Sequence, residues 1–195
     1  MSMERLSRKD LMTLEAYAEA RPRFRARVMA HKKDRRVAIG DHASLYFEDR
    51  LTIHYQVQEM LRAEKIFAAP AIDEELAAYN PLIPDGSNWK ATFMLEYANR
   101  EERLRRCREL VGIEDRVWVQ VGGGERLFAI ADEDLPRSTD EKTSTVHFLR
   151  FELPAGELRA VAGGAPIRMG IDHAGYRCEV ILSDVVRRSL SADLG

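Results

Sequence analysis

The strongest constraint on the fold comes from segments in which every second residue is apolar. Five apolar side chains alternate with other residues from Trp89 to Tyr97, so they would all point to one side of a β-strand. In the segment 145–153, Leu149, Phe151 and Leu153 share one phase in the same way. Shorter alternating segments predict further strands at 36–39, 44–47, 117–121, 127–130 and 176–182.

The connections between these strands are short and rich in turn residues. Gly40-Asp41 predicts a turn between the first two strands, and the triple glycine at 122–124 predicts a hairpin turn. The triple glycine lacks the Lys-Ser/Thr pair of a phosphate-binding P-loop, and no helix follows it. Short connections favour antiparallel pairing, because parallel strands need longer crossovers. The polar segment 132–144 is expected to be an exposed loop.

Helical spacing of apolar residues occurs on both sides of the strand-rich region. Ser7 predicts a helix N-cap, and Pro22 either kinks the first helix or begins a second one. The segment 50–67 predicts the longest helix, with apolar residues from Ile53 to Leu61 on one face. Further helices are predicted at 74–79, 99–112, 154–161 and from Ser183 onward.

Length and composition favour one folded domain that spans residues 1–195. Hydrophobic residues make up 45% of the chain and charged residues 32%, which is enough apolar material for a core. The fold class that these patterns predict is α+β: a mainly antiparallel sheet with helices packed on it, N-terminal helices and a closing C-terminal helix.

The same composition argues for a cytoplasmic protein with no membrane partner. The longest apolar runs are too short to span a bilayer, and the first ten residues lack the apolar region of a secretory signal. Cys107 and Cys178 lie in different predicted elements, which favours reduced thiols over a disulfide framework.

Charge is unevenly distributed along the chain. The first 40 residues hold 11 Lys/Arg and 5 Asp/Glu, although the formal net charge of the whole chain is −2. A basic N-terminal third could bind nucleic acid, but its cations spread around a helix, and a solvated face is the expected interpretation. The residues concerned are Arg21, Arg23, Arg25, Arg27, Lys32, Lys33, Arg35 and Arg36.

A candidate catalytic or metal-binding cluster lies where the strand ending at Glu48 meets the helix 50–67. Glu48, His54, Glu59 and Glu64 supply groups for acid–base chemistry or metal ligation. Arg50, Gln58 and Arg62 could bind an anionic ligand beside them. Alternatively, these carboxylates pair with Arg or Lys, and the stripe of His54, Gln58 and Arg62 is a solvated helix face. No bound cofactor is predicted, and a metal ion is kept as the alternative.

Two other chemically active side chains have structural interpretations. His147 is in phase with Leu149 and Phe151, which predicts a hydrogen-bonded core histidine. Cys107 lies between Arg106 and Arg108, but its helical phase with apolar residues predicts burial.

Several stretches together resemble an uncharacterised bacterial domain-of-unknown-function family. The resemblance covers nearly the whole chain, and its most specific block runs from Phe47 to Arg62. The stretches that carry it are Arg8–Leu11 with Tyr17, Lys32–Val37 with Gly40, Leu45–Arg50, Tyr55–Arg62 with Glu64, Gly112–Glu114 and Val146–Leu153. Genes of this family often lie beside genes for rubrerythrin-like proteins and iron–sulfur oxidoreductases.

The resemblance implies an accessory or interaction role in a bacterial redox or peroxide-response system, with a rubrerythrin-like or iron–sulfur protein as the partner. Whether the chain is an enzyme stays open, and so does its assembly into a homo-oligomer. Two cysteines are too few to hold a four-thiolate iron–sulfur cluster, so such a cofactor would belong to the partner.

Overall fold

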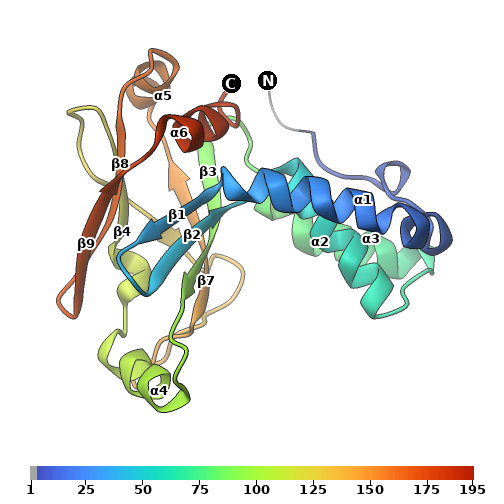
Figure 1. The fold of residues 1–195 in the computed structure, drawn as a ribbon, viewed down its shortest axis with the longest axis horizontal. Helices are drawn as coiled ribbons and strands as arrows, with labels where there is room; N and C mark the ends of the chain where they lie inside the picture. The colour runs from blue at the N-terminus through green and yellow to red at the C-terminus, as the bar shows by residue number, and fades with distance from the viewer. Residues whose placement is uncertain (1–3) are drawn as a thin grey trace.

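The computed structural model describes residues 4–195 and confirms the predicted α+β class. Its strands form two sheets, and every neighbouring pair of strands is antiparallel (Figure 1). The first sheet has the order β1 (Arg36–Ile39), β2 (Ala43–Phe47), β3 (Asn88–Leu95), β7 (Val146–Glu152) and β6 (Ile130–Ala131). The second has the order β5 (Leu127–Phe128), β4 (Val117–Val121), β8 (Ile167–His173) and β9 (Tyr176–Ile181).

One apolar core lies between the two sheets. Trp89 and Phe93 of β3 are fully buried in it, together with Val119 of β4 and Met169 of β8. The sheets also meet at their edges, because β1 contacts β8 and β9, and β5 contacts β7. The alternating residues that predicted the strands therefore form the inner faces of both sheets.

A second apolar core belongs to the helices that project from one end of the strands (Figure 1). These elements are η1 (Arg8–Asp10), α1 (Leu14–Lys33), α2 (Arg50–Ala63), α3 (Ala69–Tyr79) and η2 (Asn80–Leu82). Ile53, Val57 and Leu61 of α2 fill this core, as their helical spacing predicts. The remaining helices are α4 (Arg100–Glu109), η3 (Ile113–Arg116), α5 (Ala155–Ala162) and α6 (Asp184–Ser191).

The N-terminal helices differ from the sequence-based expectation in their boundaries. Ser7 caps the short η1, whereas Thr13 caps α1 and accepts a hydrogen bond from the backbone N–H of Ala16. Helix α1 continues through Pro22, which lies on its exposed side, where water can satisfy the carbonyl that loses its helical partner. Helix α2 ends at Ala63, because the left-handed backbone of Lys65 (φ 53°) turns the chain.

Two glycine turns are confirmed, and one strand was missed. Gly40 has a φ of 68° between β1 and β2, and the triple glycine connects the antiparallel pair β4 and β5. The missed strand is β8, whose central Gly170 weakens the alternating pattern. A Cβ atom at Gly170 would overlap the ring of Trp118 on β4, so glycine is required there by packing.

A buried charge cluster joins the helices to the sheets. Arg35 follows α1 and is 1% exposed. Its guanidinium donates to the backbone oxygens of Phe47 and Glu48, both at 3.1 Å, and to Asp193 Oδ2 at 2.5 Å. Asp49, the N-cap of α2, lies 3.4 Å from Arg35 and 2.5 Å from His31 of α1. Burial raises the pKa of Asp193 to about 6, and Arg35 opposes this effect.

Replacing Arg35 by Met should therefore lower the free energy of unfolding by about 3–5 kcal/mol, because two buried carboxylates would lose their cation. The matched control is Arg36→Met, which removes a half-exposed guanidinium paired with Glu96 and should cost less than about 1 kcal/mol. Urea denaturation at pH 7 measures both values. Equal losses in the two variants would show that the cluster does not stabilise the junction.

Candidate functional site

The four candidate catalytic or metal-binding residues do not meet in one site. Glu48 directly precedes the N-cap of α2, whereas Glu64 is its C-cap. A helix of 14 residues at about 1.5 Å per residue separates the two carboxylates by roughly 20 Å. Among residues 4–195, the cluster suited to metal ligation is a different one, formed by Glu114, Asp132 and His147.

Glu59 joins α2 to α1. Its carboxylate accepts two hydrogen bonds from the Arg21 guanidinium, at 2.7 and 2.9 Å, and a third from Tyr17 Oη at 2.7 Å. Arg62 lies 3.7 Å away on the same helix. The hydrogen bonds from Arg21 are the main reason that the pKa of Glu59 falls to about 2. This carboxylate thus has the arginine partner that the alternative interpretation expected.

Two of the predicted ligand-binding residues, Gln58 and Arg50, form hydrogen bonds with the N-terminal segment, the residues that precede α1. Gln58 is fully buried, accepts a hydrogen bond from Met12 N at 2.6 Å and donates to Met12 O at 3.4 Å. Arg50 donates to Asp10 at 2.6 Å. His54 packs against the Phe24 ring, with 5.2 Å between ring centroids, and burial lowers its pKa. In the stripe of His54, Gln58 and Arg62, the first two residues therefore face neighbouring chain, whereas Arg62 is half-exposed, as the solvated-face alternative expected.

Some cations of the basic N-terminal third are not available to a nucleic acid in the folded protein. Arg21 is paired with Glu59 and Arg35 is buried, so neither presents a free cation. Arg23, Arg25 and Arg27 are exposed on α1; Arg23 and Arg27 stand four positions apart and share one face with Glu19, whereas Arg25 points to another side.

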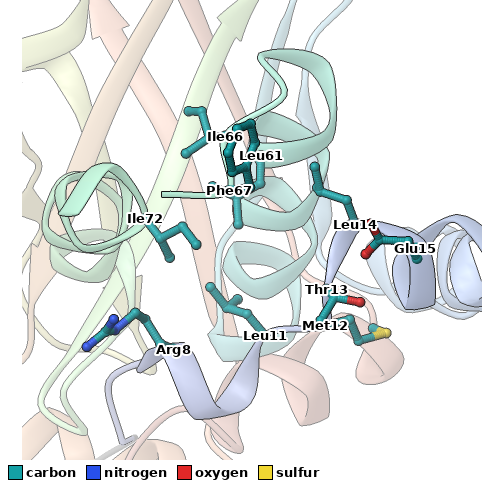
Figure 2. Close-up of a pocket in the computed structure, with 10 residues that line it drawn as sticks. All are labelled: Arg8, Leu11, Met12, Thr13, Leu14, Glu15, Leu61, Ile66, Phe67 and Ile72. Atoms are coloured by element: carbon teal, nitrogen blue, oxygen red, sulfur yellow. The ribbon is translucent and has the colours of Figure 1, made fainter. Parts of the chain in front are cut away.

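An apolar groove opens between η1, α2 and α3 (Figure 2). It has a volume of about 400 Å³ and apolar walls. Leu11 comes from the segment before α1, Leu14 from the first turn of α1, Leu61 from α2 and Ile72 from α3. Phe67, in the turn after α2, lies at the groove with 80% of its side chain exposed.

Polar contacts hold the N-terminal segment across the helices and so shape this groove. Asp10 accepts from Ser7 and Arg50, and the Ser7 hydrogen bonds lower the pKa of Asp10 to about 2. Leu6 N donates to Asn80 Oδ1 at 2.7 Å, and Gln58 binds both backbone groups of Met12. The segment therefore bridges α2 and α3 at fixed points and leaves the hollow between them.

A second polar cluster surrounds His147. The sequence predicted a hydrogen-bonded His147 but not the partners that form the cluster. His147 is fully buried, as its phase on β7 predicts. Its Nδ1 lies 2.6 Å from Asp132 Oδ2, and its Nε2 lies 2.8 Å from Thr143 Oγ1 and 3.8 Å from Glu114. Ser138 donates to the second oxygen of Glu114. The segment 132–144 is thus not a free loop, because its two ends are fixed to β7 and η3.

The chemistry of this cluster favours a structural role. Asp132 lies against Nδ1 of the His147 ring, and Glu114 lies on the Nε2 side, so the two carboxylates approach different nitrogens. Each polar group already has hydrogen-bond partners in Thr143, Ser138 or Arg137. Asp132 was hidden in a polar sequence, and only its positive φ of 48° marks it as special.

Glu59→Gln should lower the free energy of unfolding at pH 7 by about 1 kcal/mol, because a partly exposed Arg–carboxylate pair is lost. The pKa of Glu59 is lower in the folded state than its ordinary value of 4.5, so its contribution is present above pH 4.5 and is lost as the pH falls towards 2. Urea denaturation should therefore show a smaller difference from wild type at pH 3 than at pH 7. Glu109→Gln is the control; a pH-independent difference for Glu59→Gln would contradict this account.

Asp132→Asn should destabilise the protein by about 2–3 kcal/mol, since a largely buried carboxylate that contacts His147 would be lost. Hydrogen exchange of residues 133–145 should accelerate at the same time. The control Asp134→Asn removes a half-exposed carboxylate paired with Arg137 and should cost less than about 1 kcal/mol. Unchanged exchange in Asp132→Asn would mean that the cluster does not anchor the loop.

Comparison with known proteins identifies the family but no activity. The family described as "Protein of unknown function (DUF3501)" matches residues 5–194. A crystal structure at 1.90 Å of a novel protein of unknown function from Burkholderia pseudomallei K96243 is 51% identical, with a TM-score of 0.94. The match covers 98% of this chain and 100% of that one. No curated protein matches the chain. No helix in residues 4–195 is long and apolar enough to cross a membrane. The chain belongs to the DUF3501 family.

Proposed function

We propose that this protein is a non-catalytic interaction protein that binds an apolar segment of a partner protein in the groove between η1, α2 and α3. The observation that carries the proposal is Phe67, a large aromatic side chain that is 80% exposed beside an apolar hollow of about 400 Å³ (Figure 2). Exposed aromatic side chains next to apolar pockets are common at protein interfaces.

The form of the groove supports an apolar segment as its occupant. Its walls are the side chains of Leu11, Leu14, Leu61, Ile66 and Ile72, and Arg8 and Glu15 lie at its edge. An apolar centre with a polar edge is the usual anatomy of a binding surface. Burial of the Phe67 ring and of the groove walls would supply the binding free energy.

The partner class rests on the family resemblance. The resemblance implies genes that lie beside those of rubrerythrin-like proteins and iron–sulfur oxidoreductases, so we propose one of these two classes as the partner. The redox cofactor would then belong to the partner, and the present chain would position or regulate it within a bacterial redox or peroxide-response system.

The test is co-purification of the tagged protein from its own cells, with retained proteins identified by mass spectrometry. The wild type should retain a rubrerythrin-like or iron–sulfur protein, and Phe67→Ala should retain at least about tenfold less, because an exposed hot-spot side chain is lost. Ile181→Ala is the matched control, since it removes another exposed apolar side chain (61%) on β9.

Both variants should fold as wild type does, because truncating an exposed side chain changes stability by only about 0.5 kcal/mol. Equal retention by Phe67→Ala and wild type would remove the groove from the proposal. Retention of neither partner class would overturn the redox role. A wild-type protein that is dimeric in gel filtration but monomeric as Phe67→Ala would show that a second copy occupies the groove, which would also contradict the proposal.

A further inference from the structure

A separate cleft lies on the outer face of the first sheet, where η2 covers β3 and β7. It has a volume of about 290 Å³ and shares no lining residue with the groove. Pro81 and Leu82 of η2 and Phe148 of β7 supply apolar surface, and Glu48 and Lys90 supply opposite charges. The other charged lining residues are ion-paired, Glu133 with Arg150 and Asp134 with Arg137. Its size suits a ligand no larger than an amino acid or a dipeptide.

Glu48 and Lys90 are neighbours on adjacent strands. Phe47 of β2 pairs with Ala91 of β3, and the next step along the ladder is the hydrogen bond from Glu48 N to Lys90 O at 2.8 Å. Cross-strand neighbours of opposite charge usually form an ion pair. Within residues 4–195, however, the Lys90 ammonium and the Glu48 carboxylate are not within 4.0 Å of each other or of another opposite charge.

Within residues 4–195, the side-chain hydrogen bonds that hold Glu48 in place come from neutral groups. Its side chain accepts hydrogen bonds from Thr52 at 2.6 Å, Gln56 at 2.9 Å and Thr92 at 2.9 Å. The residue is only 3% exposed. A buried carboxylate without a cation is unfavourable, and a cationic group that entered the cleft would relieve this cost.

Lys90 presents the complementary charge. Its Nζ donates to Pro81 O at 2.5 Å, which leaves two of its three N–H groups for another acceptor. Burial lowers the pKa of Lys90, in keeping with its position under η2. Arg150, the other cation of the cleft, is already paired with Glu133 at 2.8 Å and with Glu152 at 2.5 Å. Lys90 is therefore the cation that a ligand would meet.

We propose that this cleft binds a small aminocarboxylate, with its ammonium group on Glu48 and its carboxylate on Lys90. Such a ligand completes both charge pairs at once and lays its carbon skeleton against Leu82 and Phe148. The side chains of Thr52, Gln56 and Thr92 orient Glu48 and leave room on its carboxylate for a charge-assisted hydrogen bond from the ligand. This site is independent of the groove proposed above for a protein partner.

The test is titration of the isotope-labelled protein, followed by NMR, with L-leucine, 4-aminobutanoate and 6-aminohexanoate. These probes differ in the distance between their two charges. Each is compared with two analogues, one without the amino group and one without the carboxylate. We expect at least one probe to shift the amide resonances of Lys90 and Phe148, and both of its analogues to bind at least about tenfold more weakly, because each loses one charged contact.

Lys90→Met and Glu48→Gln should each abolish the shifts, whereas the control Lys142→Met, which removes an exposed lysine from the loop after β6, should not. Circular dichroism checks that every variant is folded. If Glu48→Gln does not fold, the test relies on Lys90→Met. The proposal is overturned if none of the three probes shifts the resonances of the cleft. It is also overturned if a probe and its analogues bind equally well, because the charges would then play no part.

Discussion

The rest of the structure depends on a guanidinium group that is almost completely removed from water. Arg35 directly follows α1, and its guanidinium donates to the backbone oxygens of Phe47 and Glu48 at the end of β2. It also donates to the backbone oxygen of Ser189 in α6 and to the Asp193 carboxylate after α6. A buried cation of this kind is favourable only while all its acceptors stay in place. The N-terminal helices α1 to α3 and the two sheets each have their own apolar core. The orientation of the helices relative to the sheets therefore depends on this polar junction.

That orientation creates both candidate binding sites. The helical layer carries the Phe67 groove, built where a fixed N-terminal segment crosses α2 and α3. On the side that meets the sheet, η2 lies over β3 and β7 and encloses the cleft of Glu48 and Lys90. Glu48 belongs to both systems, because its backbone oxygen accepts from Arg35 while its side chain lines the cleft. A disturbance of the junction would therefore reach the cleft directly.

The His147 cluster fixes the opposite end of the molecule in a similar way. His147 and Thr143 come from β7 and the segment before it, Glu114 from η3 and Asp132 from the chain after β6. Polar groups buried together must satisfy one another, and here they order a loop that has little apolar surface of its own. Two buried polar clusters, rather than larger apolar cores, thus position the irregular parts of this fold.

The sequence by itself determined most of the secondary structure and the class of the fold. The single strand predicted at 127–130 is, however, two short strands, β5 and β6, which belong to different sheets. Apolar residues at every second position predicted β3, β4, β7 and β9, and apolar residues at helical spacing predicted α2. Glycines predicted the turns at Gly40 and at residues 122–124. These features depend on neighbours along the chain. The sequence-based prediction missed β8. The glycine at position 170 is required there because the ring of Trp118, a residue far away in the sequence, occupies the space of a side chain. Which charges meet was decided only by the tertiary structure. Glu59 pairs with Arg21, Asp132 lies against His147, and Glu48 has no cationic partner among residues 4–195. Side chains that folding brings together can be distant in sequence, so no local pattern predicts such partners.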